Sequence, residues 1–267
     1  MSKKTRVDLH NHTTLCNHAT GTVEEYVKRA IELGIDEYGF ACHAPMNFDP
    51  KYRMKLEERN IYEKWVNEAK EKYKDKIKVL LGYEVDFLNG FMLDEILNAN
   101  VDYLIGSVHF LQNKNEMWGF DNPEFIGVYK SVDIDKIWED YFDAIEAMAK
   151  TNYFQIVGHL DLIKVFKFLP KKDVRLIAKN ALKQIKKSNM ILELNPAGLR
   201  KPIEETYPSK ALLEEAFDLG INITFGSDAH SVEHVGFGYS EISSLAKELG
   251  YTKCATFYKK EMNLIEF

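Results

Sequence analysis

The sequence predicts a single α/β domain, and a closed barrel of parallel strands related to the (β/α)8 type is the favoured architecture. Three observations support this prediction. Short apolar segments alternate with longer amphipathic ones about seven times, as expected when parallel strands are joined by crossover helices. Hydrophobic residues make up 45% of the 267-residue chain, which is enough for a sizeable core. No linker or fixed-period repeat divides residues 1–267, which indicates one domain. An open doubly wound sheet is the alternative architecture.

The expected elements follow one another in regular order, and capping residues mark several helix starts. Thr22 and Glu25, for example, have the spacing of a capping box. The expected strands are 6–12, 37–43, 78–87, 101–110, 154–162, 190–196 and 222–230, with a weaker one at 254–258. The expected helices are 23–34, 60–74, 93–99, 133–151, 173–188, 209–220 and 240–250.

Two long irregular stretches, 44–59 and 111–131, are rich in aromatic and polar residues. Stretches of this length in a compact domain are often lids or binding loops. Trp118, Phe120 and Tyr129 in the second stretch could cover an imidazole ring, but aromatic side chains that pin a loop to the core are the simpler interpretation.

Composition and charge argue against several classes of function. The net charge of −6 gives no electrostatic reason to expect nucleic acid as the main partner. The basic start MSKKTRV is not followed by the apolar core of a signal peptide, and no apolar run reaches membrane-spanning length. Cys16, Cys42 and Cys254 are odd in number and widely spaced, which indicates reduced thiols. We therefore expect a cytoplasmic protein without a membrane partner, and the sequence leaves its oligomeric state open.

Histidines gather where the expected strands end. Asp8, His10 and His12 fall in phase on one face of the first strand. Seven of the eight histidines and two carboxylates stand near the carboxyl ends of strands: His10, His12, His18, His43, Glu84, His109, His159, Asp228 and His230. In a barrel these ends meet on one face, and so much buried imidazole would be costly without a cation to bind. Nine ligands require two or three ions, and abundant imidazole without cysteine ligands favours Zn, Mn or Fe.

The motifs DLHNHT and SDAH, together with the histidines and Glu84 between them, resemble the polymerase and histidinol phosphatase (PHP) superfamily. All nine metal-binding positions of that family have matches, spread over most of the chain. The resemblance implies a distorted (β/α)7 TIM-like barrel with a three-ion site at the C-terminal ends of the strands. It assigns the first ion to His10, His12, Glu84 and Asp228, the second to Glu84, His109 and His159, and the third to His18, His43 and His230.

Four further motifs, CNHATG, GSVHF, GHLDLIK and ELNPAGLRKP, resemble the histidinol-phosphate phosphatase branch of this superfamily. This branch implies hydrolysis of L-histidinol phosphate to L-histidinol and phosphate in histidine biosynthesis. Arg200 matches a substrate-phosphate-binding arginine of the branch. Lys164 stands where the branch commonly has a second basic residue, often arginine, and a lysine there keeps the charge but loses the two-pronged contact.

Clustered divalent ions suit phosphate-ester hydrolysis, because they acidify bound water and neutralise phosphoryl oxygens. The expected nucleophile is a hydroxide that bridges two ions, with Glu84 as their bridging ligand and Arg200 orienting the phosphate. Asp228 is the candidate carrier of the proton that the leaving alkoxide needs. His234 is a rival candidate for the acid and a candidate substrate contact. An exposed loop histidine with no role in the reaction is about as good an interpretation of this residue.

Other residues near the strand ends have candidate supporting roles. Asp8 and Asp161 could orient ligand imidazoles, although ordinary hydrogen bonding explains them nearly as well. Glu193 and Asn195 share a strand face and could bind a substrate amine or hydroxyl, or satisfy neighbouring polar groups. Cys42 adjoins a ligand in its strand and is therefore expected to point away from it into the core.

Three alternative functions remain. A phosphoesterase of the same superfamily could act on another small phosphoester or on a nucleotide. A metal-dependent amidohydrolase usually has a bridging lysine, and no lysine stands at a suitable strand end here. A protein that only stores metal would not need Arg200 or two long aromatic loops.

Overall fold

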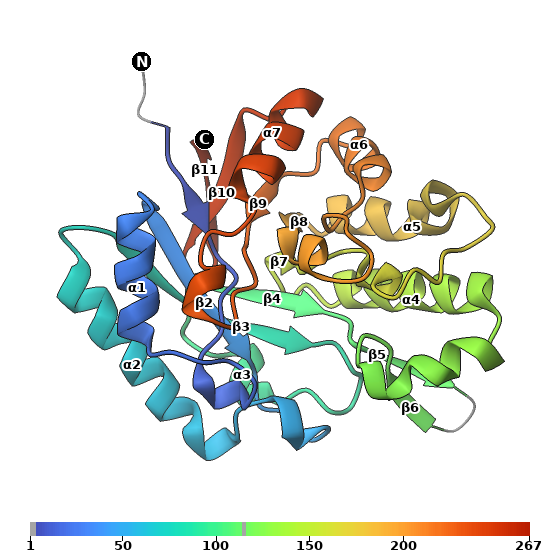
Figure 1. The fold of residues 1–267 in the computed structure, drawn as a ribbon, viewed down its shortest axis with the longest axis horizontal. Coiled ribbons are helices and arrows are strands. Elements are labelled where there is room, and N and C mark those ends of the chain that lie inside the picture. Colours follow the sequence, from blue (N-terminus) through green and yellow to red (C-terminus); the bar gives the residue numbers. More distant parts are fainter. Residues whose placement is uncertain (1–3, 114–115) are drawn as a thin grey trace.

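A seven-stranded parallel sheet forms the centre of the computed structural model, which describes residues 4–113 and 116–267 (Figure 1). Its strand order is β1-β2-β3-β4-β7-β8-β9, and every neighbouring pair is parallel. The strands are β1 (Val7–Asp8), β2 (Glu37–His43), β3 (Lys78–Asp86), β4 (Tyr103–Ser107), β7 (Ile156–Val157), β8 (Ile191–Leu194) and β9 (Ile223–Phe225). Each matches one expected strand, and five of them are markedly shorter than expected.

The first and last strands of the sheet come together and nearly close it into a barrel. The backbone N–H of Leu9 donates to the carbonyl of Phe225 over 2.8 Å, and that of Asp228 donates to the carbonyl of His10 over 2.8 Å. These contacts confirm the barrel and exclude the open doubly wound sheet, whose edge strands lie apart.

Among the described residues, seven α-helices follow the strands and cover the outside of the barrel (Figure 1). They are α1 (Val23–Glu32), α2 (Arg59–Tyr73), α3 (Asp94–Leu97), α4 (Ile134–Lys150), α5 (Val174–Lys187), α6 (Lys210–Asp218) and α7 (Tyr239–Leu249). The expected capping box begins α1, because Thr22 and Glu25 bond each other's backbone N–H groups. The expected helix 93–99 is confirmed only as the single turn of α3.

The end of the barrel opposite the strand carboxyl termini is filled by aromatic packing. Tyr103 is fully buried, and its hydroxyl donates to the carbonyl of Leu9. A Cβ atom on Gly39 would lie 2.1 Å from this hydroxyl, so only glycine fits there. The hairpin of β10 (Lys253–Tyr258) and β11 (Glu261–Glu266) covers this end, with Phe257 packed 5.9 Å from the Tyr103 ring centre.

The stretch 111–131 is more ordered than its sequence indicates. β5 (Phe110–Asn113) and β6 (Glu116–Gly119) form an antiparallel hairpin, followed by a 3-10 helix over Pro123–Ser131. Residues 114 and 115 of this stretch lie outside the described residues. Trp118, Phe120 and Tyr129 are buried and pack against one another, which confirms that these aromatic side chains pin the segment to the core.

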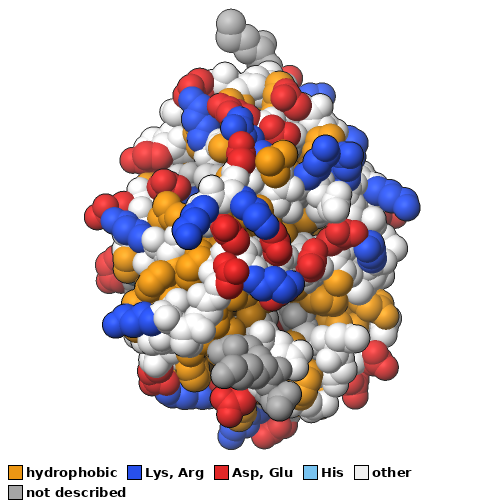
Figure 2. All heavy atoms as spheres, turned by 90° about the vertical axis from the view of Figure 1, so that its right-hand side faces the viewer, with side chains coloured by type: hydrophobic (Ala, Val, Ile, Leu, Met, Phe, Trp, Pro, Cys, Tyr) orange, Lys and Arg blue, Asp and Glu red, His pale blue; other side chains and the backbone are white. Residues whose placement is uncertain are grey.

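Acidic and basic side chains are intermixed on the face of the molecule that carries α4 and α5, and hydrophobic side chains gather in the lower half of that view (Figure 2). Among the residues that the structure describes, no helix combines the length and the apolar character needed to cross a bilayer.

Candidate metal centre

The nine residues expected to bind metal come together at the carboxyl ends of the parallel strands. The ring centres of His12 and His230 are 3.9 Å apart, and those of His109 and His159 are 4.9 Å apart. Each of the nine contacts at least one other member of this group, which we call the histidine cluster. They come together because the carboxyl ends of the strands in a parallel barrel lie on one face.

Glu84, near the end of β3, is the centre of the histidine cluster. Its Oε1 atom lies 2.9 Å from Nε2 of His159, and its Oε2 atom lies 2.9 Å from Nδ1 of His43 and 3.4 Å from Nε2 of His10. Burial raises the pKa of Glu84, but the positive charges of His43 and His10 outweigh burial and hold that pKa well below its usual range. A buried, ionised carboxylate surrounded by imidazoles can bind a divalent metal ion together with them.

Asp228 belongs to the loop after β9 and lies on the other side of the cluster. Its Oδ1 atom lies 3.1 Å from Nε2 of His12 and 3.4 Å from Nδ1 of His230. Asp228 and His159 adopt positive φ angles of 52° and 25°, which non-glycine residues rarely do. Such backbone conformations concentrate at functional sites, where the surrounding structure maintains them.

Two further carboxylates orient ligand rings from outside the cluster. Nδ1 of His10 lies 2.7 Å from Oε1 of Glu193, and Nδ1 of His109 bonds Asp86. Asp86 also pairs with the buried guanidinium of Arg53, whose Nη2 atom lies 2.6 Å from Oδ2 of Asp86. Outer partners of this kind fix the tautomer and orientation of a metal-ligating imidazole.

The close approach of Glu193 requires a glycine opposite it. A Cβ atom on Gly226 would lie 2.1 Å from Oε1 of Glu193 and 2.6 Å from Cβ of His10. Any larger residue at this position would therefore displace either the orienting carboxylate or the ligand.

The pKa values of the imidazoles divide into two groups. Burial lowers the pKa of His12 and of His109, but hydrogen bonding to Asp228 and the charge of Asp86, respectively, raise these pKa values to about 9 and about 10. At His18, partial burial and the neighbouring imidazoles lower the pKa to about 4. His230 has its pKa lowered well below the usual range, first by burial and then by His12.

The donor set fits divalent metal ions. Nε2 of His10 and Nε2 of His230 are buried and make no hydrogen bond to any residue in the ranges 4–113 and 116–267. Groups of three potential ligand atoms lie within 4.8 Å of one another, among them His10 with His12 and Glu84. Imidazole and carboxylate are the ligands that Zn, Mn and Fe prefer, so this face of the barrel is a divalent metal site.

A cavity of about 600 Å³ opens over the histidine cluster and contains Arg200 and His234 in its wall. Nη2 of Arg200 donates to the carbonyl oxygens of Ser227 and Asp228, each over 3.1 Å. Its Nη1 atom is buried and has no hydrogen-bond partner among the described residues. His234 is partly exposed, and burial followed by the charge of Arg200 lowers its pKa.

Lys164 lies apart from this cavity wall. Its buried ammonium group contacts Oδ2 of Asp161 at 2.9 Å, Oε2 of Glu205 at 3.1 Å and the carbonyl of Thr206 at 2.8 Å. These three acceptors use all three N–H donors of a lysine. The structure therefore places Lys164 in an ion-pair network, and Lys164 is not among the described residues that line the cavity.

Several residues with expected supporting roles have different partners in the structure. Asp8 accepts hydrogen bonds from Ser227, Asn11 and Gly236, and in the described part of the chain it bonds no imidazole. Asp161 bonds Ser209 and Lys164 instead of a histidine. Of the two interpretations of Asp8 and Asp161, the structure supports ordinary hydrogen bonding, because both carboxylates tie loops together.

Glu193 and Asn195 form hydrogen bonds with residues of the histidine cluster and are not among the described residues that line the cavity. Glu193 bonds His10 and the backbone N–H of His159, and the Asn195 amide donates to Glu193 and to Asp228. Sequence reasoning did not single out Asp86, although it stands two positions after Glu84 in a strand and so shares its face.

Comparison with known proteins agrees with this geometry. The PHP domain family matches residues 8–197, and the PHP-associated family matches residues 213–249. The chain belongs to the PHP family. Its nine cluster residues are divided between the two matched segments, since the PHP-domain match includes seven and Asp228 and His230 lie in the PHP-associated match.

This PHP protein resembles several histidinol phosphatases along nearly its whole length. It is 36% identical to the "Probable histidinol-phosphatase" of Deinococcus radiodurans, with 96% of this chain and 97% of that protein covered. It is 30% identical to the histidinol-phosphatase of Bacillus subtilis, with 87% and 96% covered. The fold matches the crystal structure of histidinol phosphate phosphatase from Lactococcus lactis complexed with Zn, L-histidinol and phosphate, with a TM-score of 0.79, 23% identity, and 97% and 98% of the two chains covered.

Proposed function

We propose that this PHP protein hydrolyses L-histidinol phosphate to L-histidinol and phosphate in histidine biosynthesis. The observation that carries the proposal is a guanidinium group in the wall of a cavity directly above a divalent metal site, in a chain 36% identical to a histidinol-phosphatase relative. Arg200 has one buried nitrogen that no described residue satisfies, and a phosphate oxygen is the partner it best fits.

The metal centre in this proposal holds three ions of Zn, Mn or Fe. Glu84 would contribute to holding two of them, because each of its oxygens faces a different set of imidazoles. His18 and His230 hold the third together with His43, and their ring centres lie 4.6 Å apart. Residues 1–267 act as one functional domain, since ligands come from both matched family segments.

Bound divalent ions would supply positive charge for the phosphoryl oxygens and a water molecule acidified toward neutral pH. Arg200 orients the phosphate, and its contact with the Asp228 carbonyl couples the phosphate position to this ligand. Asp228 receives the proton of the attacking water and passes it to the leaving alkoxide, because its carboxylate is ionised and borders the cavity. His234 binds substrate rather than acting as the acid, because its lowered pKa leaves it neutral.

The cavity also suits the organic part of the substrate. Tyr52, Phe110, Phe125 and Tyr207 form part of its wall and provide flat surfaces for an imidazole ring. The carboxylate of Asp121 borders the same space and provides a partner for the ammonium group of L-histidinol. The three free thiols suit a reducing compartment, so we place the reaction in the cytoplasm.

Hydrolysis of a phosphomonoester panel tests the proposed activity. The protein is loaded with Mn, Zn or Fe and assayed with L-histidinol phosphate, a nucleoside monophosphate and an aromatic phosphomonoester. We expect kcat/KM for L-histidinol phosphate to exceed the others by at least about a hundredfold. A preference for the nucleotide would assign the chain to another phosphoesterase activity of the same family.

Two basic residues provide a matched pair of variants. Arg200→Lys is expected to lower kcat/KM for L-histidinol phosphate about tenfold, and Arg200→Ala more, because lysine cannot form the two-pronged contact. Inorganic phosphate should inhibit the wild type competitively and Arg200→Ala much less.

Lys164→Met should leave KM near the wild-type value and destabilise the fold by about 3 kcal/mol, because it leaves the buried Asp161 carboxylate without its positively charged partner. An increased KM for Lys164→Met would return this residue to the substrate site.

A further inference from the structure

Most imidazoles of the histidine cluster direct one ring nitrogen inward and hold the other nitrogen with an oxygen acceptor. Nδ1 of His10 lies 2.7 Å from Oε1 of Glu193, and Nδ1 of His18 lies 2.8 Å from the carbonyl oxygen of Cys16. The same arrangement recurs at His109 with the Asp86 carboxylate and at His230 with the Asp228 carbonyl. The pattern predicts an outer acceptor for a ligand that points Nε2 into the cluster. His12 and His159 both point Nε2 inward, and their buried Nδ1 atoms have no hydrogen-bond partner among the described residues.

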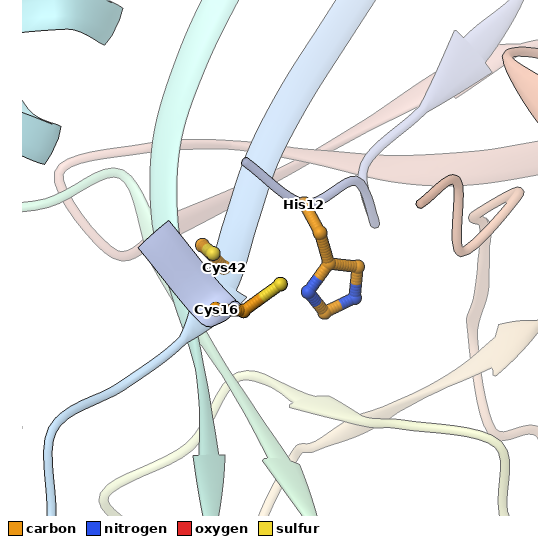
Figure 3. A group of neighbouring side chains, drawn as sticks. All are labelled: His12, Cys16 and Cys42. Atoms are coloured by element: carbon orange, nitrogen blue, oxygen red, sulfur yellow. The ribbon is translucent and has the colours of Figure 1, made fainter. Parts of the chain in front are cut away.

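His12 follows the pattern on its inner side but has no oxygen acceptor on its outer side. Its Nε2 atom faces Oδ1 of Asp228 at 3.1 Å, whereas its Nδ1 atom is buried and makes no hydrogen bond of ordinary geometry to any described residue, sulfur atoms included. The side chains of Cys16 and Cys42 lie next to it, and the two sulfurs and a His12 nitrogen are all within 4.8 Å of one another. Figure 3 shows the His12 ring turned with one nitrogen toward these thiols.

The Cys42 sulfur is held as an acceptor by the residue that follows His12. Both the backbone N–H and the hydroxyl of Thr13 donate to Cys42 Sγ, each over 3.3 Å. The Cys16 thiol donates to the carbonyl oxygen of Thr13 over 3.1 Å. The side chains of Thr13, Cys16 and Cys42 are all buried.

We propose that the Cys42 sulfur is the outer acceptor for the Nδ1–H group of His12 and that Cys42 positions this ligand for metal binding. Cys42 takes the place that Glu193 has for His10 and Asp86 has for His109. It is a positioning residue, because it acts through His12 and does not line the substrate cavity. The inference rests on the proposed metal centre and adds a role that core packing alone would not require.

Metal affinity separates positioning from packing. The Zn²⁺ affinity of metal-free full-length protein is measured by chelator competition for the wild type, Cys42→Ala, Cys42→Ser and Cys254→Ala. Cys254 is the matched control, since its thiol is equally buried but packs in the hydrophobic cluster around the C-terminal hairpin. Thermal unfolding of each metal-free variant records the effect on packing.

We expect Cys42→Ala to weaken Zn²⁺ binding about 10- to 100-fold, the usual effect of losing an outer partner. Cys42→Ser should recover most of this affinity because a hydroxyl also accepts a hydrogen bond. Cys254→Ala should lower the unfolding temperature without changing affinity. At saturating Zn²⁺, KM for L-histidinol phosphate should be the same in Cys42→Ala and the wild type.

Wild-type affinity in Cys42→Ala, or equal losses in the Ala and Ser variants, would overturn the positioning role while leaving the proposed function intact. If Cys42→Ala does not fold, Cys42→Val provides a side chain of similar size without an acceptor. The same loss of Zn²⁺ affinity is expected for Cys42→Val. A wild-type protein that binds no Zn²⁺, Mn²⁺ or Fe²⁺ would overturn the proposed function and this inference with it.

Discussion

The histidine cluster has two halves that differ in charge. In the carboxylate half, Glu84 and Asp228 contact the imidazoles of His10, His12, His109 and His159. The imidazole half consists of His18 and His230, and of these only His230 reaches a cluster carboxylate, Oδ1 of Asp228 at 3.4 Å. Its borderline member His43 contacts both His18 and Glu84. The pKa of His12 is raised to about 9, chiefly by its hydrogen bond to Asp228, which outweighs burial. In the imidazole half, the pKa of His18 is lowered to about 4 by burial and by its neighbours.

This difference indicates how firmly each half holds a cation. Metal affinity increases with the number of charged ligands, so two buried anions would neutralise an ion bound in the carboxylate half. An ion bound in the imidazole half would have mainly neutral ligands and would retain more of its charge. We therefore expect two tightly held ions and one that exchanges readily.

Replacement of Glu84 should have the largest effect, because this residue joins most of the carboxylate half. Glu84→Gln keeps the shape of the side chain but removes the charge that faces five imidazoles. We expect kcat/KM to fall about 10²- to 10³-fold, the scale of breaking a buried charge pair. Steady-state kinetics with measured metal content checks this prediction, and a loss of tenfold or less would argue against a bridging role.

His43 provides an intermediate test because it lies on the border between the two halves. Its Nδ1 atom is 2.9 Å from Glu84, and its ring centre is 5.3 Å from that of His18. His43→Ala should reduce kcat/KM by roughly 10- to 100-fold, between the effects of Glu84→Gln and His18→Ala. An effect as small as that of His18→Ala would place His43 wholly in the imidazole half.

Proton release should distinguish the halves when metal binds. The raised pKa values of His12 and His109 mean that both rings are protonated at pH 7.5 in the metal-free protein. Metal binding must displace these protons, so affinity in the carboxylate half should rise with pH up to about 9 to 10. His18, with a pKa of about 4, has no proton to lose above pH 6. Calorimetry in buffers of different ionisation enthalpy measures the released protons, and their absence would contradict the raised pKa values.

The same shifts set the sign of a stability change in the metal-free protein. A histidine whose folded pKa is raised stabilises the fold fully below its unfolded value of about 6.5 and loses this contribution as pH rises through the folded value. The metal-free protein should therefore become less stable between pH 7 and pH 10. Thermal unfolding in the presence of a chelator checks the direction, and constant stability over this range would count against it.

Loss of His18 should have the smallest effect on catalysis. His18 lies at the exposed edge of the cluster and contacts neither Glu84 nor Asp228 directly. His18→Ala should reduce kcat/KM by about tenfold or less at saturating metal, and raise the metal concentration needed for full activity. A loss equal to that of Glu84→Gln would show that the two halves depend on each other.

The sequence was sufficient to predict the barrel and the convergence of the nine cluster residues. Both predictions depend on period and position, because parallel strands present their carboxyl ends on one face whatever the details of packing. The hairpin of β5 and β6 was missed because its polar and aromatic residues show no regular alternation. β11 was also missed, since it is mostly exposed and has no apolar face.

Predictions of outer partners were less successful for a physical reason. Asp8 and Asp161 were chosen by phase along a strand, but phase does not show which loop returns to meet a side chain. Arg53 reaches Asp86 from an irregular loop, and Cys42 faces His12 across an adjacent segment. Such contacts depend on tertiary structure, whereas ligands at strand ends depend mainly on topology.

The direct test of the two-halves account is a stepwise metal titration of the metal-free protein, followed by calorimetry for the wild type and His18→Ala. The account predicts two tight equivalents and a third that binds at least about tenfold more weakly in the wild type, with only the weak phase lost in His18→Ala. Three equivalents of equal affinity in the wild type, or loss of a tight phase in His18→Ala, would contradict it.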